Sequence, residues 1–423
     1  MSNEYIVVKQ SLGLNGKADL VGAKNAVLVI MASLILTSGK SRLTNVPCSA
    51  DVLQMIKLLE SLGAQVFFDK EDHVLEVDTS TIDKYTVPSD IMSKMRASVL
   101  VMGPLLARFG QVNLALPGGC VIGARPIDYH LKNFEKMGAV IDIKDVSISA
   151  QVKALQATKI MLDYPSVGAT ENVLMAAVCT QGKTTIVNAA LEPEVCDLIT
   201  VLQKMGAKIS TFAPATIEVE GVAKLNPIEH AIIFDRLEAG ALLLAAAITG
   251  GQIELSQAPA YALDMFLMKL QEMGHDIKVG ADGVGIILKA TKTPRAVSFE
   301  TGPYPGFPTD LQAPMMALQC VAQGTACIRE RVFENRLLHV SQLQKMGAQV
   351  KIDHTTAMVT GVPQLYGASV IASDIRASCA LVLAGLVAEG KTIMHGVHHW
   401  KRGYDRLEQK LANLGASIKF VSE

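Results

Sequence analysis

One phrase recurs six times along this chain of 423 residues: an amphipathic run, then Leu or Met, then Gly, then a strand-like run. Examples are LLESLGAQV, VLQKMGAKI and QLQKMGAQV. A glycine just past the end of a helix adopts the left-handed conformation at low cost. Each phrase therefore predicts an outer helix followed by a strand. The six glycines lie 68 to 75 residues apart, at Gly63, Gly138, Gly206, Gly274, Gly347 and Gly415.

A second glycine precedes each outer helix and closes a run that is apolar on nearly every side, such as NAVLVIMASLILTSG. These glycines are Gly39, Gly110, Gly182, Gly251, Gly324 and Gly390. A helix that is apolar all round is buried all round. Each copy should thus hold a buried helix, a strand, an outer helix and a further strand. We expect an α/β fold of two similar lobes, each with three buried helices inside and sheets outside.

The second copy is the longest between its two glycines, with 28 residues against 23 to 25 in the others. The extra length falls in LALPGGCVIGARPID, a glycine-rich stretch that contains Cys120. An insertion in one copy of a repeat is a common place for function to be added.

The sixth copy is too short to be complete. Only 7 residues follow its repeat alanine, Ala416, whereas 28 to 32 residues separate that alanine from the next buried helix in other copies. The stretch before Lys24 supplies the missing length, so the N-terminal strands should complete the sixth copy. We predict one domain of residues 22–229 and another of residues 1–21 and 230–423, with the chain crossing back near Pro227.

The six buried helices are expected to begin at comparable points of the repeat: Lys24, Arg96, Thr170, Glu238, Asp310 and Arg376. Helix N-termini carry unpaired N–H groups and a positive partial charge. If the two lobes face each other at these ends, the active site lies where the two groups of three copies meet, and it is an anion site.

Composition narrows the class of protein. Lys plus Arg (39) nearly balances Asp plus Glu (40), which argues against a general nucleic-acid binder. A mean hydropathy of +0.31 raises the question of a membrane. The longest apolar stretches, residues 26–36 and 239–248, fall short of the roughly 20 residues that a membrane helix needs. The N-terminal residues carry no export signal. The seven cysteines are scattered and form no C-x-x-C pair, so we expect no disulfide framework, no structural zinc and a cytoplasmic location.

Two segments stand out near helix starts. GAKNA places Lys24 and Asn25 at the first turn of a buried helix, where a lysine is unfavourable unless an anion binds. The alternative is a solvated lysine. PGGCVIGARP places Cys120 five residues before Arg125, a cation that would favour the reactive thiolate. The alternative is an ordinary surface thiol. The other six cysteines lie in apolar or strand-like contexts, where we expect inert thiols.

Further charged residues recur at matched repeat positions. TGPYPGFPTD delivers Asp310 to a helix start, where it could be a plain N-cap. FENR, DIRAS and KRGYDR add Arg336, Arg376 and Arg402. Each arginine alone is more often a surface residue than a ligand. Several at equivalent positions favour a binding role.

Two motifs are misleading. Residues 385–392 fit the P-loop pattern GxxxxGKT, but a P-loop needs a strand before it and a helix after it. Here an apolar helix precedes and a strand is expected to follow. His395, His398 and His399 could suggest a metal, but no carboxylate or cysteine cluster accompanies them, and strand and turn positions explain them better.

The chain resembles the UDP-N-acetylglucosamine 1-carboxyvinyltransferases, the enolpyruvyl transferases that open peptidoglycan synthesis. The resemblance covers essentially the whole chain and rests on GAKNA, PGGC-x-IGARP-x-D, SVGAT, FPTD, FENR and RGY. It implies two inside-out α/β barrel domains of three repeats each. It also implies transfer of the enolpyruvyl group from phosphoenolpyruvate to the 3-hydroxyl of the amino sugar with release of phosphate. No cofactor, metal, nucleic acid or membrane is implied.

The resemblance assigns roles to individual residues. Cys120 matches a proton donor that can form a covalent phosphoenolpyruvate adduct, and Asp310 matches the residue beside the sugar hydroxyl. The phosphoenolpyruvate contacts would be Lys24, Asn25, Arg125, Arg376 and Arg402. The UDP-sugar contacts would be Arg96, Arg125, Pro126, Ile127, Asp128, Tyr129, Tyr164, Ser166, Val167, Asp310 and Val332.

One position departs from the family pattern. Some members carry a lysine in the segment before SVGAT, whereas this chain reads DYPSVGAT with Tyr164. Uridine binding would then depend more on Ser166, Val167 and backbone groups. Two rival functions stay open from the sequence alone: the shikimate-pathway enolpyruvyl transferase, which shares fold and donor but is expected to lack the Cys120 loop and FENR, and a repeat protein that binds ligands without catalysis.

Overall fold

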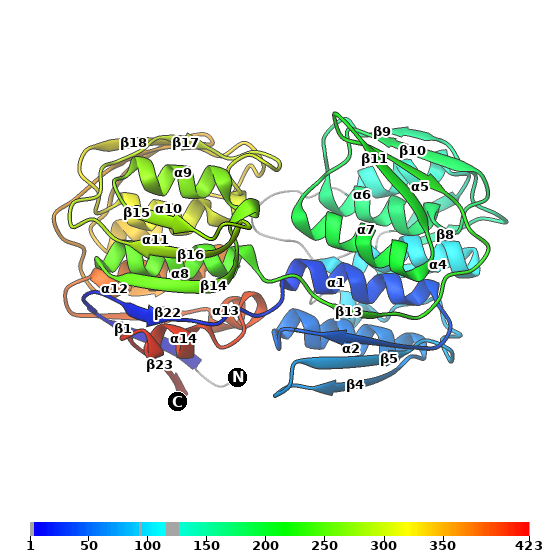
Figure 1. Cartoon of the computed structure of the whole chain (residues 1–423), viewed down its shortest axis with the longest axis horizontal. Helices are drawn as coiled ribbons and strands as arrows, with labels where there is room; N and C mark the ends of the chain where they lie inside the picture. Colours follow the sequence, from blue (N-terminus) through cyan, green and yellow to red (C-terminus); the bar gives the residue numbers. More distant parts are fainter. Residues whose placement is uncertain (1–3, 93–94, 116–126, 145, 423) are drawn as a thin grey trace. The chain divides into compact units, whose positions relative to one another are not determined.

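The computed structural model describes residues 4–92, 95–115, 127–144 and 146–422. These residues form two compact units, with boundaries after Val21 and after Ile233 (Figure 1). The first unit contains residues 22–115 and 127–233. The second unit contains residues 4–21 and 234–422. Each unit is built from three copies of the repeat.

The first unit holds both outer and buried helices. Its elements are α1 (Lys24–Ser33), η1 (Leu34–Leu36), β3 (Lys40–Thr44), α2 (Ala50–Leu62), β4 (Gln65–Asp69), β5 (Val74–Asp78), α3 (Ser89–Met92), η2 (Arg96–Val101), α4 (Met102–Phe109), β6 (Gln111–Ala115), α5 (Asp128–Lys136), β7 (Val140–Lys144), β8 (Ser147–Gln151), β9 (Lys159–Met161), α6 (Val167–Ala177), β10 (Lys183–Val187), α7 (Pro193–Met205), β11 (Lys208–Phe212), β12 (Thr216–Glu220) and β13 (Glu229–Ala231).

The second unit repeats this order and adds the N-terminal strands. Its elements are β1 (Glu4–Lys9), β2 (Asn15–Lys17), α8 (Arg236–Thr249), β14 (Gln252–Pro259), η3 (Ala260–Ala262), α9 (Asp264–Glu272), β15 (Asp276–Val279), β16 (Val284–Lys289), β17 (Phe299–Glu300), η4 (Thr309–Leu311), α10 (Gln312–Gln319), β18 (Thr325–Arg329), α11 (Val340–Lys345), β19 (Gln349–Asp353), β20 (Thr356–Thr360), β21 (Ser369–Ile371), α12 (Ile375–Val387), β22 (Lys391–His395), α13 (Val397–Gly403), α14 (Leu407–Asn413) and β23 (Ser417–Ser422).

The described residues form six sheets, of which five share one strand order. A short edge strand runs parallel to its neighbour and the remaining pairs are antiparallel, as in β9, β10, β12 and β11. In the second copy the described strands form a three-stranded sheet of β6, β8 and β7. There the parallel edge is reduced to a single bridge between Thr86 and Asn113.

Strands from the two ends of the described chain share one sheet. β1 lies between β22 and β23 and is antiparallel to both, with Ile6 opposite Met394 and Phe420 (Figure 1). β2 forms the parallel edge beside β14, and β13 forms the parallel edge beside β3. Each unit therefore receives a short edge strand from the chain segment just before it crosses to the other unit.

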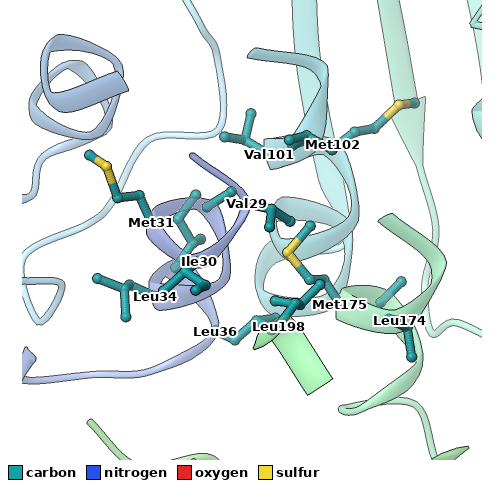
Figure 2. Packing of buried hydrophobic residues seen from close by; sticks show 14 of the residues in the cluster. Val29, Ile30, Met31, Leu34, Leu36, Val101, Met102, Leu174, Met175 and Leu198 are labelled. Atoms are coloured by element: carbon teal, nitrogen blue, oxygen red, sulfur yellow. The ribbon is translucent and has the colours of Figure 1, made fainter. Parts of the chain in front are cut away.

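The buried helices form the centre of each unit, as the apolar runs predict. All residues of α8 are buried, and α8, α10 and α12 pack against one another. In the first unit most residues of α1, α4 and α6 are buried. Figure 2 shows side chains of α1, α6 and α7 meeting there, among them Val29, Met175 and Leu198, which are fully buried. Burying one such side chain contributes about 1.5–3 kcal/mol. The predicted α/β class, with three repeats around buried helices in each unit, is confirmed.

All six repeat glycines have left-handed backbone, with φ between 92° and 108°, which confirms the helix ends read from the sequence. Of the second set of glycines, five have positive φ. The exception is Gly251. In that copy Gly250 takes the left-handed conformation instead, with φ of 74° at the end of α8.

The starts of the buried helices differ from the expected positions. α6, α8 and α12 begin one to three residues earlier, because Ser166, Asp235 and Asp374 cap them. In the second and fifth copies the expected start falls instead in a 3₁₀ turn, η2 or η4. In both copies the α-helix begins only two residues before a proline, at Met102 before Pro104 and at Gln312 before Pro314. Proline lacks the N–H and clashes with the carbonyl four residues back, so the α-helix cannot include that turn.

We expect Gly390→Ala to lower the free energy of unfolding of the second unit by about 1–2 kcal/mol. Gly390 has φ of 91°, and a methyl group added there would meet open space, so the cost is backbone strain alone. Chemical denaturation followed by tryptophan fluorescence would measure it, because Trp400 lies in the same unit.

The matched control is Gly302→Ala, also in the second unit and also with open space, but without positive φ. This change should leave stability unaltered or raise it by about 0.4–1 kcal/mol. Equal losses in the two variants would contradict the backbone explanation.

Candidate functional site

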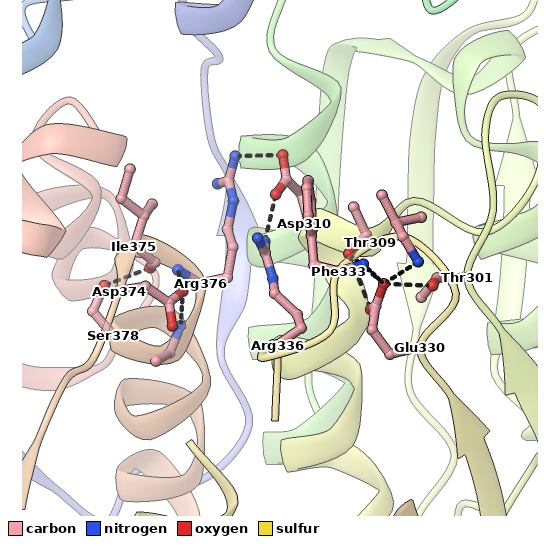
Figure 3. A network of polar contacts seen from close by, with 12 residues as sticks. Thr301, Thr309, Asp310, Glu330, Phe333, Arg336, Asp374, Ile375, Arg376 and Ser378 are labelled. Carbon is pink, nitrogen blue, oxygen red and sulfur yellow. Dashed lines mark hydrogen bonds and ion pairs between the residues drawn. The ribbon is translucent and has the colours of Figure 1, made fainter. Parts of the chain in front are cut away.

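In the second unit, two buried arginines meet one carboxylate. Arg336 Nη2 lies 2.5 Å from Asp310 Oδ1, and Arg376 Nη2 lies 3.1 Å from Asp310 Oδ2 (Figure 3). The arginine side chains are 3% and 7% exposed, whereas that of Asp310 is 25% exposed. The carboxylate is thus the part of this cluster that solvent, or a substrate, can reach. Asp310 is not the plain N-cap that its place at a helix start allowed, because its side chain binds two guanidinium groups.

Arg376 is fixed on both sides. Its Nη1 donates to the hydroxyl of Tyr404, 3.2 Å away, and its guanidinium lies 5.7 Å from the centre of the Tyr404 ring. Burial would lower the pKa of Arg376, but the charge of Asp310 raises it well above the usual range. Burial also raises the pKa of Tyr404. The arginine therefore carries its charge permanently, and the tyrosine stays a neutral phenol.

Arg336 sits between two further groups. Its guanidinium lies 5.4 Å from the centre of the Phe333 ring. Burial acts to raise the pKa of Asp374, but Arg336 and the amide of Ala377 outweigh it and hold that pKa below its usual value. The same carboxylate caps α12 by accepting from the N–H groups of Arg376 and Ala377. Burial lowers the pKa of the neighbouring His339 to about 4, so this imidazole is neutral at pH 7.

A second carboxylate, Glu330, lies directly after β18 and is buried. It accepts hydrogen bonds from the hydroxyls of Thr301 and Thr309 and from the N–H groups of Val332 and Phe333 (Figure 3). The predicted contact residue Val332 is therefore held through its backbone, which leaves its carbonyl and side chain for other contacts.

The remaining predicted residue of the second unit is Arg402, half-buried on α13. The pKa of His399 is lowered to about 4, mainly by burial and further by the nearby His398 and Arg402. His398 and His399 both lie on helix α13, so the turn positions expected for them are wrong, whereas His395 does lie on a strand, β22.

In the first unit, Lys24 is the first residue of α1 and is buried, so the alternative of a solvated lysine is wrong. Its Nζ lies 3.3 Å from Oδ2 of Asp51, which is in the first turn of α2 and is also buried. A carboxylate of the chain thus balances part of the lysine charge. Asn25 follows on α1 and is half-buried.

Several predicted residues lie in or near the glycine-rich stretch of the second copy. Cys120, Arg125 and Pro126 lie outside the described residues, as does the side chain of Arg96, whose backbone begins η2. Ile127 precedes α5. Asp128 and Tyr129 occupy the first turn of α5, where Asp128 Oδ2 lies 3.5 Å from Lys132 Nζ.

The SVGAT segment begins α6. The Ser166 hydroxyl accepts from the N–H of Ala169, 3.4 Å away, and so caps the helix. Val167 is the first helical residue, and the backbone N–H of Ser166 donates to the carbonyl of Tyr164 at 2.7 Å. The cap and this backbone hydrogen bond give the segment a structural role. They place Tyr164, Ser166 and Val167, all half-buried, on one turn.

The described cysteines differ in exposure, and burial makes several of their thiols unreactive. It raises the pKa of Cys179 to about 11, of Cys320 to about 12 and of Cys379 to about 11. Cys196 is exposed on α7 rather than in an apolar context, yet partial burial and nearby carboxylates also raise its pKa. Cys48 and Cys327 are half-buried.

Three other expectations concern the P-loop pattern, a metal site and a membrane-spanning helix. Residues 385–392 run from the end of α12 into β22, the reverse of the P-loop order. Across the described ranges, no group of three or more His, Cys, Asp or Glu side chains is placed to hold a metal ion. No described helix combines the length and apolar character needed to cross a membrane.

Three important residues were not predicted from the sequence: Asp51, Glu330 and Tyr404. Asp51 looks like an ordinary first-turn carboxylate, and Glu330 like a charged residue at a strand end. Tyr404 belongs to the RGY phrase, so a signal existed there. The contacts of Asp51 and Glu330 join segments 27 and 29 residues away, which no local pattern indicates.

Comparison with known proteins shows the family to which the chain belongs. The family model described as EPSP synthase (3-phosphoshikimate 1-carboxyvinyltransferase) matches residues 8–411. The chain is 46% identical to the UDP-N-acetylglucosamine 1-carboxyvinyltransferase of Cellvibrio japonicus, with 99% of both chains covered. It is 47% identical to UDP-N-acetylglucosamine 1-carboxyvinyltransferase 1 of Caldanaerobacter subterraneus subsp. tengcongensis, covering 97% of this chain and 98% of that one. The enzyme of this name from Geobacter metallireducens is 45% identical, covering 99% of this chain and 100% of that one.

Solved structures show the same fold. The enolpyruvyl transferase NikO from Streptomyces tendae superposes with a TM-score of 0.90 at 25% identity, over 100% of both chains. EPSP synthase from Acinetobacter baumannii superposes with a TM-score of 0.77 at 16% identity, again over 100% of both chains. The second likeness concerns the fold alone, whereas the identities of 45–47% are far more specific. The chain therefore belongs to the enolpyruvyl transferase family, as a member of its UDP-N-acetylglucosamine 1-carboxyvinyltransferase branch.

Proposed function

We propose that this enzyme transfers the enolpyruvyl group of phosphoenolpyruvate to the 3-hydroxyl of UDP-N-acetylglucosamine and releases phosphate, the first committed step of peptidoglycan synthesis. The observation that carries the proposal is identity of 45–47% over nearly the whole length to three enzymes of that name. We place the reaction in the cytoplasm, as the scattered cysteines predict. We also propose two domains, residues 22–229 and residues 1–21 with 230–423. The pairing of β1 with β22 and β23 supports this division.

The charges of the substrates fit the residues that would bind them. Phosphoenolpyruvate carries a phosphate and a carboxylate, and the UDP-sugar carries a diphosphate. Lys24, Asn25, Arg125, Arg376 and Arg402 are the proposed phosphoenolpyruvate contacts. Guanidinium groups suit such ligands because they donate two parallel hydrogen bonds to a carboxylate or phosphate. The buried, permanently charged Arg376 supports this assignment.

The proposed roles of Asp310 and Cys120 follow from proton transfers that the addition requires. The sugar hydroxyl must lose a proton as its oxygen attacks the enol carbon, and the methylene carbon must gain one. Asp310 would accept the first, since its carboxylate is held between two arginines and is partly exposed. Cys120 would donate the second, and it could also form the covalent adduct with phosphoenolpyruvate.

The UDP-sugar would be held by residues of several segments: Arg96, Arg125, Pro126, Ile127, Asp128, Tyr129, Tyr164, Ser166, Val167, Asp310 and Val332. Because the Ser166 hydroxyl caps α6, we expect its contribution to uridine binding to come from the backbone. Tyr164 offers an aromatic ring where some members have a lysine, so stacking or packing would replace an ionic contact at this position.

The rival activity on shikimate 3-phosphate shares the donor and the fold. The family model bears that name, but the EPSP synthase structure is only 16% identical to this chain. The segments FENR and PGGC-x-IGARP favour the amino-sugar substrate, and Arg336 of FENR binds Asp310 directly.

The first test is phosphate release from phosphoenolpyruvate with each of the two acceptors. We expect turnover with UDP-N-acetylglucosamine and none with shikimate 3-phosphate. The nucleotide of the first acceptor and the carboxylic acid of the second need different contacts from the protein. Colorimetric detection of phosphate would measure both. Release with neither acceptor would instead favour a protein that binds ligands without catalysis.

We expect Asp310→Asn to lower kcat about 10²- to 10⁴-fold, the usual contribution of a general base. The amide keeps the size of the side chain but cannot accept the hydroxyl proton. Steady-state kinetics would measure the loss, with Asp353→Asn, an exposed carboxylate of the same unit, as control. A folded Asp310→Asn enzyme with wild-type kcat would rule out the proposed role.

Cys120→Ala should strongly slow phosphate release, by about 10²-fold or more, because the proton donor to the methylene carbon is lost. Cys196→Ala, at an exposed thiol with a raised pKa, should not change turnover. Mass spectrometry after incubation with phosphoenolpyruvate should detect an adduct in the wild-type enzyme and in Cys196→Ala only. Unchanged turnover of Cys120→Ala would remove this residue from the mechanism.

A further inference from the structure

Glu330 connects two irregular segments of the second unit. Its Oε1 accepts from the Thr301 hydroxyl at 2.9 Å, from the Val332 N–H at 2.8 Å and from the Phe333 N–H at 3.2 Å. The Thr309 hydroxyl lies 3.1 Å from Oε1 and 3.0 Å from Oε2. One buried carboxylate thus binds residues of both segments.

The two segments carry groups that matter for the proposed reaction. Residues 301–309 lead directly into Asp310. Residues 331–336 carry Val332 and Arg336, and Arg336 binds Asp310. The N–H of Arg331 also donates to the Thr301 hydroxyl at 2.9 Å, which completes a closed set of contacts between the segments. The position of Asp310 relative to Val332 therefore depends on the groups that join these loops.

The segment 301–309 has few backbone donors of its own. Pro303, Pro305 and Pro308 have no N–H group. The described backbone contacts within it are those of Thr301 and Gly302 with Phe307, and that between Pro303 and Gly306. A buried and well-placed side-chain acceptor can hold such a segment in place, as the backbone hydrogen bonds of a regular strand do elsewhere. Glu330 is such an acceptor.

Burying a carboxylate is costly unless hydrogen bonds compensate. Burial raises the pKa of Glu330, while the N–H and hydroxyl donors and the nearby Arg336 act in the opposite direction. Thr301 and Thr309 use their hydroxyls on Glu330 rather than on solvent. These contacts fill the acceptor positions of Oε1, so Glu330 is placed to hold the loops and not to exchange protons with a substrate.

We propose that Glu330 is a positioning residue that sets Asp310 and Val332 in register for the acceptor sugar. It acts through the loops of residues 301–309 and 331–336 and does not itself touch the substrate. This inference rests on the proposed function and assigns a determinant of acceptor binding within it.

The test compares Glu330→Ala with Glu330→Gln in the full-length enzyme. Glu330→Ala should raise KM for UDP-N-acetylglucosamine and lower kcat, together reducing kcat/KM about 10²-fold, the usual effect of a misplacement near 1 Å. KM for phosphoenolpyruvate should change less than threefold, since none of its proposed contacts lies in either loop: in this unit Arg376 is on α12 and Arg402 is on α13. Glu330→Gln should restore most of the activity, because its amide oxygen can accept the same bonds as Oε1.

The matched control is Glu408→Ala. Glu408 is another carboxylate of the second unit and accepts from the Trp400 indole N–H at 2.9 Å, outside both loops. Its kinetic constants should equal those of the wild type. Amide hydrogen exchange without substrates adds a readout independent of turnover. Val332 and Phe333 should exchange faster in Glu330→Ala than in Glu330→Gln or Glu408→Ala.

The outcomes separate the inference from the proposed function. No phosphate release by the wild-type enzyme would overturn the function, while the exchange measurement would still report whether Glu330 holds the loops. Wild-type kinetics and exchange in Glu330→Ala would overturn the inference. Equal increases of both KM values with a lowered Tm would also overturn it, because they indicate general loss of structure. Failure of Glu330→Gln to rescue would point to a requirement for the negative charge and would contradict positioning by hydrogen bonds.

Discussion

Six helices without a polar face determine the architecture. A helix such as α8, buried along its whole length, must be covered on every side. Sheets with amphipathic outer helices provide that cover in each of the three copies of a unit. Polar chemistry is then confined to the ends of the buried helices and to the loops that lead into them. Lys24, Asp310 and Arg376 all lie at such starts, which makes the distribution of charge a consequence of packing.

Within that arrangement, small local differences between copies produce different chemical groups. Pro314 prevents the α-helix from extending back to Asp310, so the aspartate lies in a 3₁₀ turn with its carboxylate toward two arginines. At the equivalent point of the sixth copy, Asp374 caps α12 and Arg376 follows within the first turn. The same repeat position thus yields a carboxylate in one copy and a guanidinium in the next, and the two form an ion pair.

Sequence reasoning predicted the α/β class, the repeat, the glycines that end the outer helices and the all-round burial of the inner ones, because these depend on local periodicity and on glycine conformation. It missed the carboxylates that contact the predicted site residues or the loops that carry them. Asp51 and Glu330 are ordinary carboxylates in sequence, and only the fold brings Asp51 to Lys24 and Glu330 to Thr309, next to Asp310. The 3₁₀ starts were also missed, although Pro104 and Pro314 carried the signal. Residue roles that rest on the resemblance remain proposals, among them that of Cys120.

The placement of β1 has a consequence for how the chain is made. Among the described strands, β1 leaves the ribosome before any other, whereas its two partner strands, β22 and β23, are the last two to be synthesised. All the described strands of the first unit have emerged once β13 has, so that unit can pair its sheets during translation while the earliest strand of the second still waits. For most of synthesis β1, with its apolar core YIVV, is an unpaired strand that other chains could pair with. Until β22 and β23 are made, this strand is a place where a chaperone that binds extended apolar segments could act against such pairing.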